Sequence, residues 1–335
     1  MSSMRTSVTH APGLAQAGVA EIQRSRLLTA AVRVCDERGY ANTSVADIVS
    51  RSHVSRRTFY EMFSSREECF LEVLEQALAQ IEAELARADL GALSWRERMR
   101  AGLYTILSFF DREPVLARVC VVHALGGGPE VLARRREIVA RLVRAVDRGR
   151  PSGRRRDGAG ELRAEGVVGA VFAIVYARLS QREHAPLAEL LGELTGMIVL
   201  PYLGAAAAAR ERQRPAPKAT PRGASANGAR AAREPAAADP LETVPMRVTY
   251  RTAKVLDGLL ELPGASNRQI GERAGISDPG QISKLLRRLA RIGLIDNGGG
   301  GHQQGEPNAW RLTARGEQVA HSIRRHALAG DRQVM

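Results

Sequence analysis

Arginines, hydroxyl groups and phenylalanines recur at helical spacing in the stretch SRSHVSRRTFYEMFSSREE near the amino end. Arg56 and Tyr60 lie four residues apart and share one helix face with Arg57 beside them, while Phe59 and Phe63 share another. Arginine donors match the acceptor edge of guanine, and hydroxyl groups hold phosphate oxygens. The stretch therefore predicts a helix with an apolar anchor and a DNA-reading face. The alternative is an ordinary solvated face of a helical bundle.

The elements around this helix are marked by capping residues. Ser44 with Asp47 predicts the start of a short helix, SVADIVSRS, and Ser55 caps the helix RRTFYEMF after a tight turn. Ser65 with Glu68 then starts a long helix. Two short helices joined by a tight turn form a helix-turn-helix, whose second helix can enter the major groove.

The whole segment GYANTSVADIVSRSHVSRRTFYEMFSSREECF resembles the DNA-binding domain of TetR-type transcriptional regulators. It shares their glycine, their paired hydroxyls, the recognition-helix pattern VS..TFY..F, and the serine, basic residue and glutamate that begin the next helix. The resemblance covers residues 21–70 closely and the helices up to IVLPYLG more loosely. It departs at His53, where the family has glycine, and at Glu61 and Met62, where members carry polar or basic residues.

The residues expected to contact DNA are those of the two caps, the second short helix and the start of the long helix. They are Ser44, Val45, Ser55, Arg56, Arg57, Thr58, Tyr60 and Arg66.

The overall charge agrees with a polyanionic partner. The chain has 335 residues and a formal net charge of +13, which favours a polyanion such as nucleic acid or an acidic membrane surface. A solvated, arginine-rich surface explains the charge equally well. No signal peptide or membrane span is expected, and Cys35, Cys69 and Cys120 lack disulfide or metal-binding spacing. A reducing, cytoplasmic location is therefore expected.

No enzyme motif accompanies these features. GxSxG, HExxH, P-loop and cysteine-ligand patterns are missing from the sequence, so we expect no catalytic residue, metal or cofactor.

The middle of the chain, residues 67–203, is helical by its apolar periodicity. The TetR resemblance implies that it binds a small-molecule effector and pairs with a second copy through its last two helices. These helices, AEGVVGAVFAIVYARLSQ and PLAELLGELTGMIVLPYLG, are apolar around more than one face, which favours a homodimer. Core packing is the alternative for each bulky or histidine side chain here. The residues expected to line the ligand pocket are Tyr104, Val119, His123, Phe172 and Tyr176.

The composition changes after Gly204. Residues 204–245 are rich in alanine, proline, arginine and glycine and poor in large apolar side chains, so we expect a flexible linker.

A second compact domain, residues 246–327, follows the linker. Ser266 with Gln269 and Asp278 with Pro279 start two helices, and two short strands flank a glycine-rich tip. This pattern resembles the winged-helix domain of MarR-like regulators. His302, Gln303 and Gln304 lie at its wing tip; the expected DNA contacts are Gln281, Ser283, Lys284, Arg287 and Arg288. A domain that binds protein, or only dimerises, is the alternative.

The sequence thus predicts a mainly α protein. A disordered tail (1–20) precedes a TetR-type helix-turn-helix domain (21–66) and an all-helical ligand and dimerisation domain (67–203). The linker, a small α+β winged helix and a tail (328–335) follow. The expected function is a ligand-responsive, homodimeric regulator that binds double-stranded DNA, with repression as the expected outcome and no membrane partner. The alternative is a sequence-tolerant basic nucleic-acid binder, which a salt series on specific and unrelated duplex would distinguish.

Overall fold

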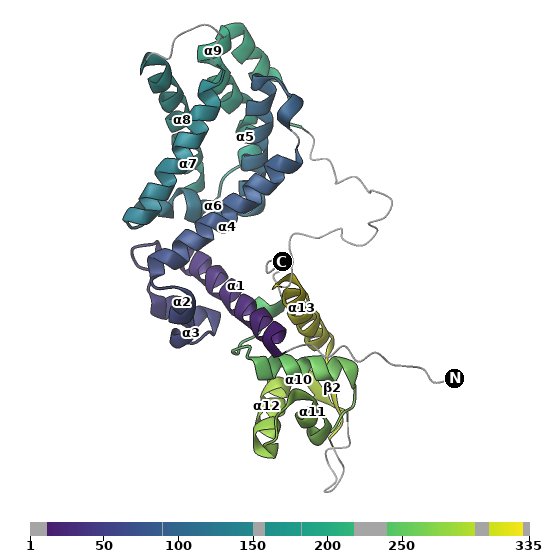
Figure 1. Cartoon of the computed structure of the whole chain (residues 1–335). Helices are drawn as coiled ribbons and strands as arrows, with labels where there is room; N and C mark the ends of the chain where they lie inside the picture. Colours follow the sequence, from purple (N-terminus) through teal and green to yellow (C-terminus); the bar gives the residue numbers. More distant parts are fainter. Residues whose placement is uncertain are drawn as a thin grey trace, which may run out of the picture. The chain divides into compact units, whose positions relative to one another are not determined.

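The structure is a computed structural model that describes residues 12–88, 90–149, 158–181, 183–217, 240–298 and 308–330. Figure 1 shows the helices and strands coloured along the sequence. Backbone contacts divide the chain into two compact units. One contains the described parts of residues 31–47 and 63–232. The other contains those of residues 1–30, 48–62 and 233–335. Each unit is described separately below.

Three helices at the amino end begin directly after the predicted caps Ser44, Ser55 and Ser65, whereas the first begins at Pro12, within residues 1–20, where a disordered tail was expected. The four helices are α1 (Pro12–Arg38), α2 (Val45–Ser52), α3 (Arg56–Met62) and α4 (Arg66–Arg87). Gly39 follows α1 in a left-handed conformation (φ 76°), which suits glycine at the end of a helix. Ser65 caps α4 by accepting a hydrogen bond from the Glu68 amide. The local signals that start α2, α3 and α4 are confirmed, because Ser44, Ser55 and Ser65 each accept a hydrogen bond from an amide of the first turn.

The helical unit continues with α5 (Trp95–Arg112), α6 (Pro114–Val121), α7 (Pro129–Asp147), α8 (Gly158–Leu179) and α9 (Leu191–Gln213), with short 3₁₀ turns η1 (Leu90–Ala92), η2 (His123–Gly126) and η3 (Leu187–Leu190). Its core is aliphatic: Leu107, Leu179 and Leu191 are completely buried. Proline at the first position of α6 and of α7 starts both helices, because proline has no amide hydrogen to leave unpaired there.

Helix α9 breaks at Gly204, whose φ is 78°, and residues 205–213 form a second helical segment. This segment packs against the glycine face of the first part of α9: a Cβ added at Gly192 would lie 3.0 Å from the Arg212 carbonyl oxygen. The Arg100 guanidinium donates to the Glu211 carboxylate at 3.1 Å, and both side chains are buried. The start of the expected linker is therefore helical and anchored. Its alanines favour helix and allow close approach.

The stretch Leu187–Gln213 has the length and the mean hydropathy (1.5) of a membrane span. The break at Gly204 and the buried Arg100–Glu211 pair instead suit a helix that packs within the protein.

The carboxyl-terminal part of the other unit contains η4 (Pro240–Thr243), α10 (Tyr250–Glu261), α11 (Asn267–Ala274), α12 (Pro279–Arg291) and α13 (Ala314–Gly330). Strands β1 (Ile295–Asn297) and β2 (Trp310–Leu312) pair antiparallel, with Ile295 opposite Leu312. Buried Leu256, Leu286 and Val319 form the core. The wing-tip residues His302, Gln303 and Gln304, and most of the expected linker, lie outside the described residues.

The first half of α1 belongs to this same core. Val19 and Ile22 cluster with the apolar residues of the carboxyl-terminal helices. An irregular segment, Val244–Val248, which we call the strap, packs in this core, and its Met246 amide donates to the Val244 carbonyl at 2.8 Å. Its residues Val244, Met246 and Val248 are buried, while Arg247 between them is exposed. The unit therefore joins the beginning and the end of the described chain in one hydrophobic core.

Candidate nucleic-acid interface and ligand cavity

Helix α2 begins with a reciprocal cap. The Ser44 amide donates to the Asp47 carboxylate at 3.0 Å, and the Asp47 amide donates back to the Ser44 hydroxyl at 3.2 Å. Arg38 also donates to Asp47 at 2.6 Å. These hydrogen bonds, those from Ser44 first, hold the pKa of the Asp47 carboxyl below its ordinary value. Ser44 is exposed and Val45 is half-buried at the start of the helix.

His53 makes the turn between α2 and α3. Its φ is 54°, in the left-handed region that glycine favours. The departure from the family pattern is therefore accommodated in the same backbone geometry, at the strain that a side chain adds there. Burial, and then the nearby charge of Arg26, lower the pKa of the His53 imidazole.

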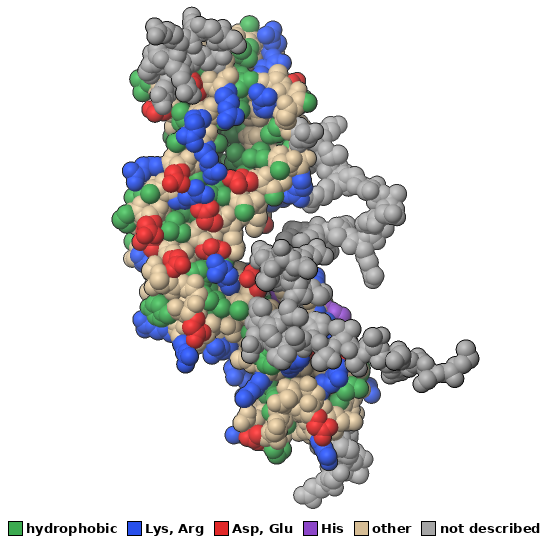
Figure 2. Space-filling view, viewed as in Figure 1, with side chains coloured by type: hydrophobic (Ala, Val, Ile, Leu, Met, Phe, Trp, Pro, Cys, Tyr) green, Lys and Arg blue, Asp and Glu red, His purple; other side chains and the backbone are tan. Residues whose placement is uncertain are grey.

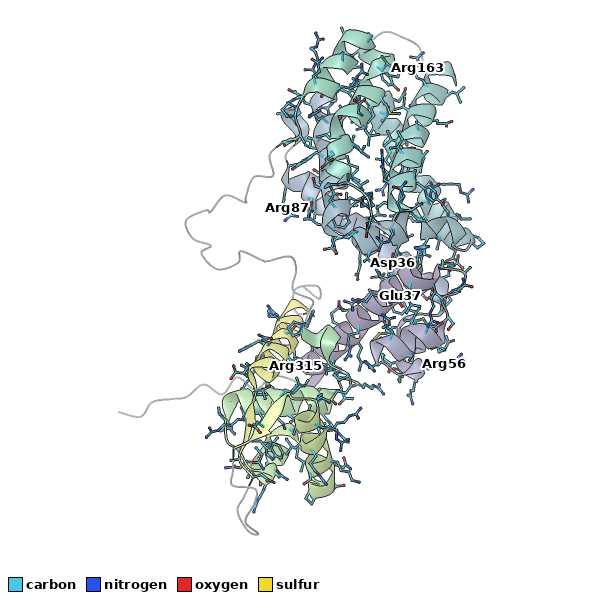
Figure 3. The ribbon with its side chains drawn as sticks, turned by 180° about the vertical axis from the view of Figure 1, so that it is seen from behind. Asp36, Glu37, Arg56, Arg87, Arg163 and Arg315 are labelled. Carbon is cyan, nitrogen blue, oxygen red and sulfur yellow. The ribbon has the colours of Figure 1, made fainter. Side chains whose placement is uncertain are left out.

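Helix α3 has one buried and one exposed face, as predicted. Phe59 is completely buried and Phe63 is 2% exposed, whereas Tyr60 is 49% exposed. The Arg56 guanidinium lies 5.8 Å from the Tyr60 ring centroid and extends away from the ribbon in Figure 3. Arg57 is exposed and donates to Glu61 at 2.8 Å across one helical turn. Arg56, Arg57 and Tyr60 thus form an exposed, cationic and aromatic surface on a fixed apolar anchor.

Thr58 lies on a different face from these three residues. It is only 4% exposed, and its hydroxyl lies 2.8 Å from the Ser55 hydroxyl. Ser55 caps α3 by accepting from the Thr58 amide at 3.1 Å. The Arg247 guanidinium donates to the same Thr58 hydroxyl at 2.8 Å. Thr58 was expected to meet DNA; its burial instead assigns it to holding the start of α3.

Arg66, expected at a phosphate, has a structural contact as well. Its Nη1 donates to the carbonyl oxygens of Tyr40 and Thr43, and its guanidinium lies 4.3 Å from the Tyr40 ring centroid. The side chain is half-buried. It therefore ties the start of α4 to the connection that precedes α2.

The expected contact residues of the carboxyl-terminal domain follow the same division. Asp278 caps α12 by accepting from the amides of Gly280 and Gln281 at 2.7 and 3.2 Å. Ser283 is half-buried and accepts from Asn267 at 3.0 Å, and the Gln281 side chain accepts from Arg251 at 2.9 Å. The exposed cations of the helix are Lys284, Arg287, Arg288 and Arg291, of which the first three are among the expected DNA contacts.

A cavity of about 320 Å³ lies within the helical unit, between α4, α5, α6, α7 and α8. Its walls are aliphatic and aromatic, and Figure 2 shows hydrophobic side chains gathered beside Lys and Arg side chains on this part of the surface. The main apolar wall residues are Leu74, Ile81, Leu103, Ile106, Phe110, Phe172 and Val175. This size and composition are typical of a site for an apolar small molecule.

Of the five residues expected in the pocket, Phe172 lines this cavity. The others do not. Val119 is completely buried in the core, and Tyr176 is 39% exposed. Tyr104 donates to the Pro217 carbonyl at 3.3 Å. On α5 the cavity instead uses Leu103, Ile106, Leu107 and Phe110, whose helical spacing is visible in the sequence and offered a signal for one shared face. The aromatic Tyr104 lies on the next face.

Three charged residues and a thiol border the apolar walls. Glu82 accepts from Arg141 at 2.8 Å, and Arg135 lies 5.5 Å from the Phe172 ring centroid. Burial, together with nearby Cys35, raises the pKa of the Cys120 thiol in the cavity wall to about 12. The thiol is therefore neutral and a poor nucleophile. The wall carries more positive than negative charge, which suits a ligand with an anionic end.

Helix α6 connects this cavity with α1. Cys120, Val121 and the following Ala124 line the cavity. On the same helix, Arg118 donates to both oxygens of Asp36 in α1, at 2.6 and 2.8 Å. The hydrogen bonds to Asp36 raise the pKa of the Arg118 guanidinium.

His123, expected at the ligand, lies near this ion pair. Burial lowers the pKa of its imidazole more than Asp36 raises it. The ring is therefore neutral near pH 7. Among the described residues, no group of three or more His, Cys, Asp or Glu side chains is placed to hold a metal ion.

Comparison with known proteins gives matches at the amino end and over the helical part. Residues 27–73 match the family described as "Bacterial regulatory proteins, tetR family". The transcriptional activator FasR of Mycolicibacterium smegmatis is 28% identical over 111 residues, which are 33% of this chain and 51% of that protein. The chain thus matches about half the length of this curated relative.

Solved structures of regulators are also similar. The fatty acid degradation regulator FadR of Bacillus halodurans has a TM-score of 0.46 at 16% identity, over 52% of this chain and 97% of that chain. FadR of Bacillus subtilis, in complex with stearoyl-CoA, has a TM-score of 0.45 at 20% identity, over 52% and 97%.

Proposed function

We propose that this chain, whose amino-terminal segment carries the helix-turn-helix of TetR-family DNA-binding regulators, is a ligand-responsive transcriptional regulator. One observation carries the proposal: α3 exposes Arg56, Arg57 and Tyr60 while Phe59 is completely buried. Arg56 and Arg57 read base edges in the major groove, and Tyr60 and the exposed Ser44 hold phosphate oxygens. Bound at an operator that overlaps a promoter, the protein represses transcription.

The effector is a largely apolar molecule with an anionic end. The cavity of about 320 Å³ offers aliphatic and aromatic walls, and Arg135 and Arg141 border it with a single carboxylate, Glu82. Burial of a hydrocarbon chain contributes about 0.8 kcal/mol per CH₂ group. A long-chain acyl thioester belongs to this class of ligand, and stearoyl-CoA serves as the probe below.

The response runs through α6. A ligand that fills the cavity presses on Cys120 and Val121, and any shift of α6 reaches α1 through the Arg118–Asp36 pair. Since α1 is continuous from Pro12 to Arg38, its displacement also reaches α3, because Arg26 of α1 holds the strap and Arg247 of the strap donates to Thr58 of α3. The ligand and DNA then compete through two conformations of one molecule.

The protein acts as a homodimer. Helices α8 and α9 expose Tyr176, Leu200 and Leu203, which are 39%, 46% and 45% exposed, and α8 also exposes the small residues Gly166 and Ala173. A homodimer formed through these helices would present the α3 helices of both copies to two DNA half-sites one helical turn apart, about 34 Å.

The carboxyl-terminal domain is a winged helix that contributes a second DNA contact. It would present α12 with Lys284, Arg287 and Arg288. A protein partner for this domain is the second candidate, and exposed Leu262 (46%) beside the sheet favours it.

Selection from a random duplex pool tests the proposal. The full chain should enrich a sequence and bind it more tightly than a scrambled duplex of equal length across a salt series. Arg57→Ala should cost about 1–3 kcal/mol at the enriched site and relax discrimination at one base pair. Stearoyl-CoA should weaken specific binding by roughly 5- to 150-fold, and acetyl-CoA should not. Equal affinity for both duplexes at every salt concentration would favour the sequence-tolerant binder.

A further inference from the structure

The strap is held on α1 by buried polar side chains. Gln23 donates to the Val248 carbonyl at 2.9 Å, and Arg26 donates to the carbonyls of Met246 and Val244 at 2.9 and 2.7 Å. Gln23 and Arg26 are only 7% and 5% exposed. A buried guanidinium that satisfies backbone carbonyls is costly to displace, because the unpaired groups would lose their hydrogen bonds without regaining water. The backbone of the strap is therefore fixed in position on α1.

Alternation along the strap then fixes the direction of Arg247. The strap has no regular secondary structure, but its side chains alternate between buried and exposed: Val244, Met246 and Val248 are buried, whereas Pro245 and Arg247 are exposed. Met246 and Val248 are buried at 3% and 1% exposure, so Arg247 points out and is exposed. Its Nη2 donates to the Thr58 hydroxyl, which places the guanidinium at the start of α3. This position follows from residues that are far apart in the sequence.

The chemistry of this position suits an anion. A guanidinium has five N–H donors in a planar fork, and Thr58 uses one of them. Within the part of the chain that the structure describes, no carboxylate pairs with Arg247. Arg56 and Arg57, which follow Ser55 at the same end of α3, are both exposed. Their guanidinium groups are less available to a phosphate than that of Arg247, since Arg56 lies over the Tyr60 ring and Arg57 forms an ion pair with Glu61.

We propose that Arg247 binds a DNA backbone phosphate beside α3. The strap that precedes the carboxyl-terminal helices would thereby supply one DNA contact of the amino-terminal helix-turn-helix, α2 and α3. This inference rests on the proposed function of α3 as the reading helix. In this arrangement Thr58 does not meet DNA. Its hydroxyl orients Arg247, and the strap positions the guanidinium before DNA arrives, which lowers the entropy lost on binding.

Arg247→Gln tests the charge. Glutamine keeps a donor for Thr58 and removes the cation. Arg87→Gln is the matched control, because Arg87 (labelled in Figure 3) is also exposed and donates one hydrogen bond to a protein oxygen, Ala83 at 3.1 Å. Affinities of the full-length variants are measured for the enriched duplex and for the scrambled duplex over a salt series. Thermal unfolding of each variant is measured alongside.

A phosphate contact has a specific signature. Arg247→Gln should lower the affinity for both duplexes by a similar factor, roughly 3- to 10-fold, because phosphates carry no sequence information. The slope of log K against log salt should fall in magnitude by about 0.9 for each bound protomer. Arg87→Gln should leave both quantities unchanged. Single phosphates of the enriched duplex can also be replaced in turn by a neutral methylphosphonate. At one position in each half-site the replacement should lower the affinity of the wild type and leave the affinity of Arg247→Gln unchanged.

Three outcomes would overturn the inference. They are an Arg247→Gln variant with unchanged affinity and slope, one with lower affinity at an unchanged slope, and one that loses affinity no more than Arg87→Gln. If the wild type instead prefers no duplex, the proposed function itself fails. The two failures are thus distinguished by the wild-type measurement.

Discussion

The Arg118–Asp36 pair connects the wall of the cavity to α1, and its removal should uncouple ligand from DNA. Its side chains are 21% and 18% exposed, and both hydrogen bonds join charged atoms at 2.6 and 2.8 Å. Hydrogen bonds to charged groups contribute about 1.5–3 kcal/mol each when covered. Because solvent reaches part of this pair, we expect Arg118→Gln to lower the free energy of unfolding by about 1.5–3 kcal/mol in total.

A double-mutant cycle with Asp36→Asn measures the interaction itself. The coupling energy from urea unfolding should be about 1–2 kcal/mol, since each single substitution already breaks the pair. The change in DNA affinity caused by stearoyl-CoA should fall from the wild-type factor to near unity in Arg118→Gln. Arg112 is the control: it donates to Glu84 at 2.6 Å but is 52% exposed, so Arg112→Gln should cost less than about 1 kcal/mol and keep the ligand response. A coupling energy near zero, or a full ligand response in Arg118→Gln, would refute the reasoning.

Three further predictions concern local structure. Phe59→Ala should cost about 3–5 kcal/mol of stability in urea unfolding, because the ring is completely buried; a cost below 1 kcal/mol would contradict its role as the anchor of α3. Gly196→Leu should release the segment 205–213, because a Cβ at residue 196 would already lie 3.0 Å from Arg212 Cγ. Amide hydrogen exchange of residues 205–213 should therefore accelerate. Gly166→Ala is the control, because a Cβ at Gly166 meets open space, and it should leave that segment protected. The pKa of the Asp278 carboxyl lies below its ordinary value of 3.8, because the carboxylate accepts hydrogen bonds from the amides of α12. The charged carboxylate therefore stabilises the fold at pH values above 3.8, and this stabilisation is lost as the pH falls through the lower pKa of the folded state. The stability difference between wild type and Asp278→Ala should therefore shrink in acid, and a constant difference would argue against the cap.

Local signals in the sequence were sufficient to predict the start and the buried face of α3. Capping pairs such as Ser44 with Asp47 act within one turn, so they mark helix starts without any knowledge of the fold. The spacing of Phe59 and Phe63 likewise gave the buried face of α3. The same reasoning gave the caps of α11 and α12.

Contacts over long sequence distances were not predictable in this way. Four of the five expected pocket residues were aromatic or histidine side chains and the fifth was Val119, but which face of α5 lines the cavity depends on how several helices pack together. The helical segment 205–213 depends on the partner Arg100, far away in sequence. The Thr58 hydroxyl accepts a hydrogen bond from Arg247, 189 positions later in the sequence, and neither residue alone carries a signal for the other.

The shared core of the first and last segments has a consequence for biosynthesis. Gln23 hydrogen-bonds Val248 across 225 positions of sequence, and Val19 and Ile22 cluster with residues as late as Ile323. The ribosome therefore exposes the apolar side of α1 long before its partners are translated. Closing so long a loop carries an entropic cost that delays folding, so completion of this core should be a late step after translation of the carboxyl-terminal helices. Until then, chaperones have an obvious binding site on the nascent amino end.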